Sequence, residues 1–507
     1  MNTTKKIRTA LISVYHKNRI SEICSRLNDL KVTMISTGGT KSFIEGLGMP
    51  VTAVEELTEY PSILGGRVKT LHPKVFGGIL ARRDEALDKE QLKQYDISEI
   101  DLVVVDLYPF EETVASGAEL QEIIEKIDIG GISLIRAAAK NFKDVIIIAS
   151  QEQFAELLEI LENGGETTLG KRKELAMKAF SISSHYDTAI FKYFNIGSSE
   201  KIFKQSIAPA KILRYGENPH QTGVFYGDFD KIFEQVHGKE ISYNNLLDIE
   251  AAIYLIDEFK ETTFAILKHN NACGISSRED LLQAYKDALA GDPVSAYGGI
   301  LITNVPINKV VAVEMDQLFF EVIIAPSYTE DALATLKSKK NRIILVRKEC
   351  ELPTKQFRTL LNGVLEQDRD LSIEDRSMMQ PVTQRRPTDK EYADLEFANK
   401  VVKHSKSNTI VLAKNNQLLA SGVGQTSRVD ALKQAIDKAK IFGFDLTGSV
   451  MSSDAFFPFS DCVEIAFKAG ILAVVQPGGS IRDKDTIDFC NGHGIAMVFT
   501  GIRHFKH

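Results

Sequence analysis

The stretch TALISVYHKNRISEICSRLNDLKVTMISTGGTK, residues 9–41, decides the fold class of this chain. Apolar runs at Ala10–Val14 and Lys31–Ile35 flank a helical stretch at Ile20–Leu30. Fully apolar strands that alternate with helices are typical of a parallel sheet covered on both faces. The stretch therefore predicts an α/β fold, in which ligands bind at the carboxyl ends of the strands.

The alternation extends beyond this stretch. Further strands are expected at Leu102–Leu107 and Val145–Ala149, which gives a parallel-sheet domain over residues 1–150. A helical connection is expected at residues 151–200, and a second region at residues 201–507.

In the second region, α/β alternation resumes. Strands are expected at Phe264–Leu267, Gly299–Thr303, Val322–Ala325, Arg342–Val346, Thr409–Ala413, Ile471–Val475 and Ile495–Phe499. The region looks like two similar halves, because KHNNACGI (268–275) and KHSKSNTIV (403–411) each join a Lys-His pair to an apolar stretch. Polar residues 355–390 with scattered prolines are expected to connect the halves.

Composition excludes several classes of protein. A chain of 507 residues is too long for one hydrophobic core. Its net charge of -7 argues against a nucleic-acid partner, and no apolar run is long enough for a membrane span or a signal peptide. The 5 cysteines include no CxxC pair, which excludes a disulfide framework and disfavours a metal site. We expect a cytoplasmic enzyme.

Two loops of the first domain are suited to an anionic ligand. Thr37-Gly38-Gly39-Thr40 lies between a strand and a helix, where backbone N–H groups can hold a phosphate. Gly65–Asp84 offers Arg67 and Lys69 as cations. Taken alone, the first loop is more often a simple turn and the second a solvated basic loop.

In the second region, Lys268-His269 is the most suggestive pair. It follows an apolar run directly, which places it at the carboxyl end of a strand. An imidazole can accept a proton near neutral pH, and a neighbouring ammonium can stabilise an oxyanion. The apolar run SSDAFFPF, residues 452–459, suits the wall of a pocket for a flat heterocycle.

The motifs SVYHK, STGGTK, LGGRVKTLHP, LYPF and IDIGG with RAAAKN resemble the inosine monophosphate cyclohydrolase domain of the bifunctional purine biosynthesis family, which has a methylglyoxal-synthase-like fold. The resemblance implies a ring-closing centre of Lys69, Tyr108, Asp128 and Lys140. It also implies that substrate is bound by Ser13, Lys17, Thr37, Gly38, Gly39, Thr40, Arg67 and Thr70. Tyr15-His16 departs from the Ser-Asp that is usual in the family.

The motifs LRYGENPHQ, KHNNACG, SKSNTI, SSDAFFPF and TGIRHFKH resemble the formyltransferase region of the same family, whose two halves have a cytidine-deaminase-like α/β fold. The resemblance implies that Lys268 and His269 are catalytic and that Asn408 assists them. It places Arg214, Tyr215, Asn245, Asp454, Arg503 and His507 near the nucleotide or the folate.

The expected function is bifunctional. The enzyme would transfer a formyl group from 10-formyltetrahydrofolate to 5-aminoimidazole-4-carboxamide ribonucleotide and then close the ring to inosine monophosphate. The family implies a homodimer and no catalytic metal. Two other hypotheses are a zinc nucleobase deaminase, whose H-x-E and P-C-x-x-C motifs are absent, and a nucleotide sensor without activity, against which Lys268-His269 and Lys69 with Tyr108 argue.

Overall fold

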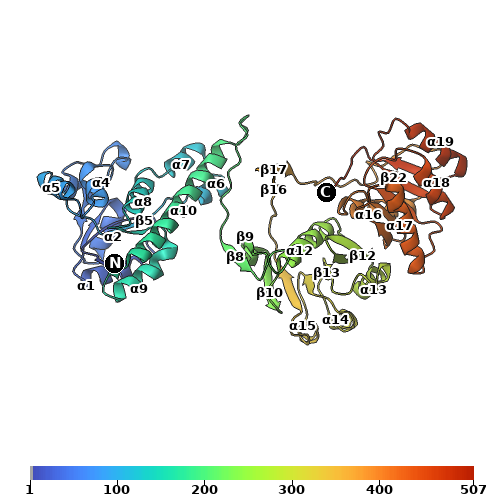
Figure 1. Ribbon diagram of the computed structural model, residues 1–507, viewed down its shortest axis with the longest axis horizontal. Coiled ribbons are helices and arrows are strands. Elements are labelled where there is room, and N and C mark those ends of the chain that lie inside the picture. The colour runs from blue at the N-terminus through green and yellow to red at the C-terminus, as the bar shows by residue number, and fades with distance from the viewer. Residues whose placement is uncertain (1–3) are drawn as a thin grey trace. The chain divides into compact units, whose positions relative to one another are not determined.

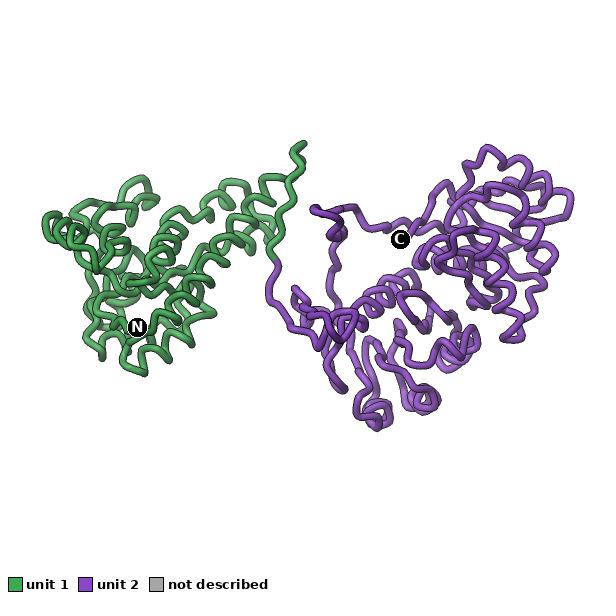
Figure 2. Tube along the Cα trace, viewed as in Figure 1, with its two compact units in different colours: residues 1–206 green, residues 207–507 purple. Residues whose placement is uncertain are grey.

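The computed structural model describes residues 4–507. It divides into two compact units, the first ending at Ser206 and the second spanning Ile207–His507 (Figure 2). Each unit has cores of its own, as the length of the chain leads one to expect.

The first unit is built on a 5-stranded parallel sheet with the order β4-β3-β2-β5-β6. Its strands are β2 (Thr9–Val14), β3 (Thr33–Ser36), β4 (Thr52–Ala53), β5 (Leu102–Asp106) and β6 (Ile146–Ile148). Since β2 pairs with β3 on one side and with β5 on the other, the chain order reverses between β2 and β5. This is the switch point at which open α/β sheets bind ligands.

Helices cover this sheet. They are α1 (Ile20–Asp29), α2 (Gly38–Gly46), α3 (Val54–Thr58), α4 (Pro73–Leu80), α5 (Ala86–Gln94), α6 (Phe110–Ala115), α7 (Leu120–Glu125), α8 (Gly130–Lys140), α9 (Phe154–Glu162) and α10 (Leu169–Phe194). α1 packs on α9, and α8 packs on α4 and α10. The expected helical connection is formed by α9 and α10, which lie in the first unit. Between them, β7 (Glu166–Thr167) pairs with β1 (Lys5–Lys6).

The second unit contains two 6-stranded sheets with the same topology, β10-β15-β14-β13-β11-β12 and β18-β23-β22-β21-β19-β20. The first consists of β10 (Phe233–His237), β11 (Thr263–Lys268), β12 (Asn271–Ser277), β13 (Ile300–Thr303), β14 (Val322–Ala325) and β15 (Ile343–Arg347). The second consists of β18 (Gln380–Pro381), β19 (Ile410–Ala413), β20 (Leu418–Gly422), β21 (Val450–Ser453), β22 (Ala473–Gln476) and β23 (Ala496–Phe499). The expected pair of similar halves is thereby confirmed.

Each sheet of the second unit carries helices on both faces. α13 (Leu281–Gly291), α14 (Lys309–Met315) and α15 (Glu330–Leu336) cover one face of the first sheet, and α17 (Arg428–Ile441), α18 (Asp461–Lys468) and α19 (Asp483–His493) cover the corresponding face of the second (Figure 1). α12 (Tyr243–Ile256) and α16 (Asp389–Lys403) share one core with the remaining faces of both sheets. That shared core joins the halves.

The halves also meet at edge strands. Ser276, in β12, bridges to Gln417, just before β20. Lys403 Nζ donates to Glu258 Oε1 at 2.8 Å, and His404 Nε2 lies 2.8 Å from the same oxygen. The Lys-His pair of KHSKSNTIV therefore serves as a clamp between halves.

The two halves align differently from what the two Lys-His pairs led us to expect. Lys268 ends β11, whereas Lys403 ends α16, so the two pairs occupy different elements. The counterpart of Lys268–Asn271 is Lys414–Gln417, which forms the turn between β19 and β20. Matching Lys-His letters was misleading because the equivalent turn reads Lys-Asn-Asn-Gln.

An exposed hairpin lies in the connection between the halves. β16 (Lys355–Leu360) and β17 (Gly363–Asp368) pair only with each other, and every residue of both strands is exposed. A second small hairpin, β8 (Ala210–Leu213) with β9 (Gly223–Tyr226), precedes the short helix α11 (Phe229–Ile232).

Candidate active sites

At the carboxyl edge of the first sheet, the loops after β2 and β5 meet. The rings of Tyr15 and Tyr108 contact edge to face, with centroids 5.6 Å apart. His16 donates its backbone N–H to Asp106 Oδ2 at 2.9 Å, and its Nδ1 lies 2.6 Å from the same oxygen. The unusual Tyr15-His16 pair thus ties the two loops together at the switch point.

The Thr37–Thr40 loop lies beside these loops, where β3 ends. α2 begins at Gly38, which has a φ of +42°. Ser13 Oγ lies 3.3 Å from Thr37 Oγ1, and Lys17 Nζ donates to Thr40 Oγ1 at 3.1 Å. Burial lowers the pKa of Lys17, although Asp106 opposes this. Glycine backbone, hydroxyls and a cation at a helix N-terminus make this loop, which we call the cradle, suited to a phosphate.

Lys69 reaches into the same cradle from the 65–72 loop. A Cβ added to Gly38 would lie 3.3 Å from Lys69 Nζ, and one added to Gly66 would lie 2.9 Å from it. Thr70 lies near the start of α8, since its Oγ1 is 3.0 Å from a Cβ added to Gly130. Arg67 forms an exposed ion pair with Glu125.

Asp128 is held just before α8. Its Oδ1 accepts the N–H of Gly131 at 2.6 Å, and its own N–H donates to Tyr186 Oη at 2.9 Å. Burial raises the pKa of Asp128, although backbone hydrogen bonds from Gly131 and Tyr108 oppose this. Burial and the charge of Asp128 raise the pKa of Tyr108, which keeps that hydroxyl a donor.

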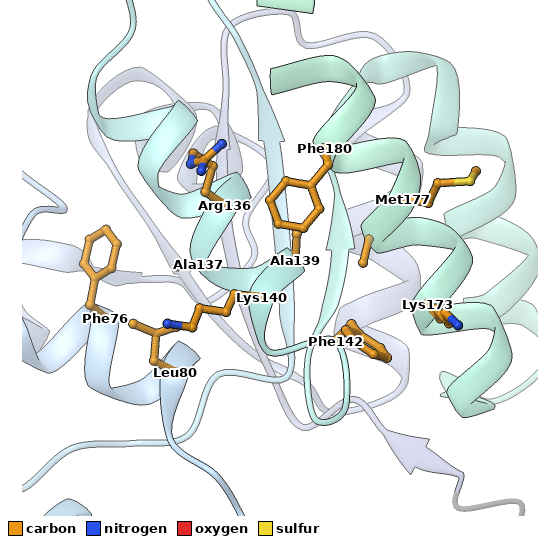
Figure 3. Close-up of a pocket in the computed structure, with 11 residues that line it drawn as sticks. Phe76, Leu80, Arg136, Ala137, Ala139, Lys140, Phe142, Lys173, Met177 and Phe180 are labelled. Carbon is orange, nitrogen blue, oxygen red and sulfur yellow. The ribbon is translucent and has the colours of Figure 1, made fainter. Parts of the chain in front are cut away.

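Lys140 lies away from this group. It ends α8, whereas Asp128 precedes the helix, so the two are separated by the helix length of roughly 16 Å. Its side chain points toward Phe76 and Leu80, and with Arg136 it lines an open hollow of about 650 Å³ between α4, α8 and α10 (Figure 3). The remaining predicted residues of the ring-closing centre gather at the sheet edge, and the position of Lys140 leaves its role a prediction.

In the second unit, the turn between β11 and β12 presents Lys268 and His269. His269 is exposed and has a φ of 50°, and Asn270 follows with a φ of 64°. Two residues with positive φ between paired strands form the tight turn that hairpins favour. Lys268 Nζ donates to the carbonyl of Tyr297 at 2.9 Å, so it lies against the DPVSAYGG segment.

A second polar group centres on Arg428, at the start of α17. Its Nη2 donates to Asn408 Oδ1 and to Asp454 Oδ1, both at 3.0 Å. Asp454 is 0% exposed, and its Oδ2 has no hydrogen-bond partner among the described residues. Arg428 is not among the site residues predicted from the sequence. Its place directly after a helix-capping Ser427 was the available signal.

The C-terminal tail joins this group. The N–H of His504 donates to the carbonyl of Asp454 at 3.0 Å, and the N–H of Ser407 donates to that of Lys506 at 2.9 Å. Arg503 and His507 are exposed on either side of Phe505, with the Arg503 guanidinium carbon 4.4 Å from the ring centre. The His504 bond therefore brings the neighbouring Arg503 near Asp454, and His507 lies against the Phe505 ring.

Three residues that were predicted to lie near the nucleotide or the folate are found near the start of the second unit. Arg214 Nη2 donates to Tyr215 Oη at 2.7 Å in an exposed turn. Asn245 is buried in the cap of α12, where its Nδ2 also donates to Glu321 Oε2 at 3.3 Å. Asn244 links the two places, because its Nδ2 donates to the carbonyl of Glu217 at 3.1 Å.

Within residues 4–507, we find no cluster of three or more His, Cys, Asp or Glu that could hold a metal ion. Over the same range, no helix is long and apolar enough to cross a membrane.

Known proteins match this chain along its whole length. The profile of the AICARFT/IMPCHase bienzyme family matches residues 138–438, and that of the MGS-like domain matches residues 19–133. The bifunctional purine biosynthesis protein PurH of Bacteroides thetaiotaomicron is 65% identical over 508 residues, covering 100% of both chains. The chain belongs to the AICARFT/IMPCHase family. The protein of the same name from Persephonella marina is 47% identical and covers 99% of this chain and 100% of its own length.

As an AICARFT/IMPCHase bienzyme, the chain is a bifunctional enzyme that catalyses the last two steps of purine biosynthesis. Family membership also confirms the α/β fold with an MGS-like first domain. The formyltransferase of this family uses formyltetrahydrofolate as co-substrate. These findings favour the bifunctional enzyme over the zinc deaminase and over the inactive sensor.

Proposed function

We propose that formyl transfer takes place at the Lys268-His269 turn. The 5-amino group of the nucleotide is a weak nucleophile because it is conjugated to a carboxamide. His269 removes a proton from that nitrogen as it attacks the formyl carbon of 10-formyltetrahydrofolate, while Lys268 stabilises the oxyanion. The C–N10 bond then breaks and N10 takes up a proton. The exposed imidazole on a fixed turn carries this proposal, and a general base of this kind contributes roughly 10²–10⁴ in rate.

Asn408 assists the catalytic pair in this proposal. The nucleotide is contacted by Arg214, Tyr215, Arg503 and His507, and Asn245 and Asp454 lie near the nucleotide or the folate. Arg428 supports the site by fixing Asn408 and Asp454 from one guanidinium. The unpartnered Asp454 Oδ2 is an acceptor that a substrate amine or amide can satisfy.

Ring closure is assigned to the edge of the first sheet. There the carboxamide nitrogen attacks the formyl carbon, and water leaves. Lys69 and Tyr108 donate to the developing oxyanion, and Asp128, whose pKa is raised by burial, orients the amide and moves a proton. The Thr37–Thr40 cradle with Lys17 holds the phosphate.

Lys69→Ala tests this assignment. Removing one oxyanion donor should slow ring closure by about 10²–10³-fold and leave formyl transfer unchanged, so that the formylated nucleotide accumulates. Stopped assays that quantify both nucleotides provide the measurement. Production of inosine monophosphate at the wild-type rate would remove Lys69 from the site. Lys31→Ala, at an exposed lysine outside the cradle, is the control.

We propose that the enzyme acts as a homodimer in which a second copy covers the β16–β17 hairpin. A lone two-stranded hairpin is marginally stable in water, and this one exposes Leu361 at 98% and Leu365 at 51%. Leu361→Asp with Leu365→Asp should shift the sedimentation coefficient toward that of a monomer. Leu87→Asp, at an exposed leucine of the first unit, should not. A hairpin variant that sediments like wild type would contradict the proposal.

We also propose that the enzyme works in the cytoplasm, which is a reducing compartment. We propose further that neither reaction uses a metal. All 5 cysteines of the chain are free, although secreted proteins commonly pair theirs. The two proposed sites contain lysine, histidine, tyrosine, aspartate, arginine and amide groups, which carry out both reactions by proton transfer and charge stabilisation.

A further inference from the structure

The turn that presents His269 has a twin in the other half of the second unit. Lys414–Gln417 joins β19 to β20 as Lys268–Asn271 joins β11 to β12, and both hairpins contain a register shift one or two residues before the turn. Asn415 and Asn416 have φ values of 55° and 52°, which match the values at His269 and Asn270. Lys414 Nζ donates to the carbonyl of Thr447 as Lys268 Nζ donates to that of Tyr297.

Each turn is anchored by an aspartate six residues after a helix cap. Asp248 Oδ1, on α12, accepts the N–H of Asn270 at 2.7 Å. Asp394 Oδ1, on α16, accepts the N–H of Asn416 at 2.6 Å. Ser242 and Thr388 cap the two helices, each with a capping box. One backbone device therefore occurs twice, and His269 stands on only one copy.

The surroundings of the two aspartates differ. Asp394 is 3% exposed, whereas Asp248 is half-buried and lies near Lys268, His269 and Glu321. Burial raises the pKa of Asp248, while the Asn270 N–H, His269 and Lys268 oppose this. The twin turn is also held from outside, because Arg278 Nη1 donates to the carbonyls of Asn415 and Asn416 at 2.6 and 3.3 Å.

We propose that Asp248 is a positioning residue for formyl transfer, which fixes the turn that presents His269 through the bond from the Asn270 N–H to its Oδ1. The inference rests on the proposed role of His269 as the base. Asn has the best tolerance for positive φ among residues other than glycine, so a turn with His at its first position depends more on its anchor than the Asn-Asn twin does. A small rotation of the turn would move the His269 imidazole away from the nitrogen of the substrate from which it removes a proton.

The two aspartates form a matched pair for the test. Asp248→Ala should lower kcat for formyl transfer by about 10- to 100-fold, as misplacement by about 1 Å does, with KM for both substrates changed less than about threefold. Asp394→Ala should leave kcat within about twofold of wild type, although it breaks the same bond. Asp248→Asn keeps an acceptor oxygen and should restore most of kcat. Ring closure by the first unit should be unchanged in all three variants.

Wild-type kcat in folded Asp248→Ala would overturn the proposal. Equal losses in Asp248→Ala and Asp394→Ala would also overturn it, because both residues would then be simple turn anchors. If Asp248→Ala does not fold, Asp248→Glu, which keeps the charge but displaces the acceptor by one methylene, must show the fall in kcat with a melting temperature near that of wild type. His269→Asn, measured in the same assay, separates the proposal for His269 from the proposal for Asp248. An active His269→Asn variant would refute His269 as the general base, whereas the comparison of Asp248→Ala with Asp394→Ala would still show whether Asp248 matters more than its twin.

Discussion

At the scale of single residues, His269 departs from the residue that its backbone conformation favours. The twin turn has Asn415 where the proposed catalytic turn has His269, with nearly the same backbone angles. Asparagine is common at such positions because its short side chain tolerates them. The exposed side chain of His269 contributes little packing, which supports its proposed role as the general base.

We therefore predict that His269→Asn abolishes formyl transfer without a loss of stability. The rate should fall by about 10²–10⁴-fold, the usual contribution of a general base, while the melting temperature equals or exceeds that of wild type. Calorimetry and a folate-linked absorbance assay measure the two quantities. A variant that is both less stable and less active would assign a structural role to the imidazole.

The sequence motifs named many residues of the candidate sites, but not the contacts that link these residues to one another. Ser13, Lys17, Thr37, Thr40 and Lys69 were named from sequence, and the structure gathers them at the start of α2. Arg428 and Asp248 were not assigned roles, because each acts through a partner far away in the sequence. Such contacts depend on the tertiary fold and leave no local pattern.

At the scale of elements, the C-terminal tail is fixed rather than frayed. His504 is 3% exposed, its Nδ1 lies 2.6 Å from Asp370 Oδ2, and its Nε2 lies 2.7 Å from Glu374 Oε2. Chain ends are usually loose. Here a buried imidazole between two carboxylates, together with the bond from the His504 N–H to the Asp454 carbonyl, holds the tail in place.

The contact of the His504 imidazole with Asp370 and Glu374 predicts a pH-dependent contribution to the stability of the fold. Burial lowers the pKa of His504, but its hydrogen bonds to Asp370 and Glu374 and their charges outweigh this and raise it to about 9 from 6.5. The contribution, on the order of 3 kcal/mol, is complete below pH 6.5 and is lost as the pH rises through 9. The difference in the free energy of unfolding between wild type and His504→Gln should therefore become smaller from pH 6 to pH 9.5. A constant difference would contradict a charged imidazole, and His237→Gln is the control.

The tail also permits a sharper test of substrate binding. Deleting residues 503–507 would remove His504 and leave the buried Glu374 with Asn399 but without the imidazole, so a loss of activity could reflect instability. Arg503→Ala removes only an exposed guanidinium. We expect a formyl-transfer kcat/KM at least tenfold lower, a loss of about 1.4 kcal/mol, with ring closure and melting temperature unchanged. Unchanged kcat/KM would exclude Arg503 from the nucleotide contacts.

Strand prediction succeeded where strands are fully apolar. Val322–Ala325 was predicted with the bounds of β14, and β11, β13 and β19 were placed within one residue at each end. The sequence did not reveal β12, β20 or β21, which are rich in Ala, Gly and Ser. Helices lie so close to two of these strands that a Cβ on Gly274 would be 1.8 Å from the Ala288 carbonyl oxygen, and one on Gly422 would be 1.9 Å from that of Ala431. Small residues that permit such packing do not produce an apolar strand pattern.

At the scale of the whole molecule, the two proposed sites belong to different units. Every residue proposed for ring closure lies before Ser206, and His185 Nδ1 lies 2.9 Å from Ser206 Oγ, which ties the end of the first unit to α10. A fragment of residues 1–206 should therefore fold and close the ring of the formylated nucleotide at a rate within about tenfold of the full chain. Circular dichroism and a single-substrate assay test this. A folded but inactive fragment would show that ring closure requires the second unit.

The doubled sheet of the second unit gives each turn a separate foundation. Both halves share strand order, register shift, capped helix and anchoring aspartate. Each turn is nevertheless part of its own hairpin and is anchored by its own helix. A substitution at His269 therefore leaves the backbone bonds of the Asn415-Asn416 turn in place, including those from Arg278. The sequence of one turn can vary while the fold of the other half is kept.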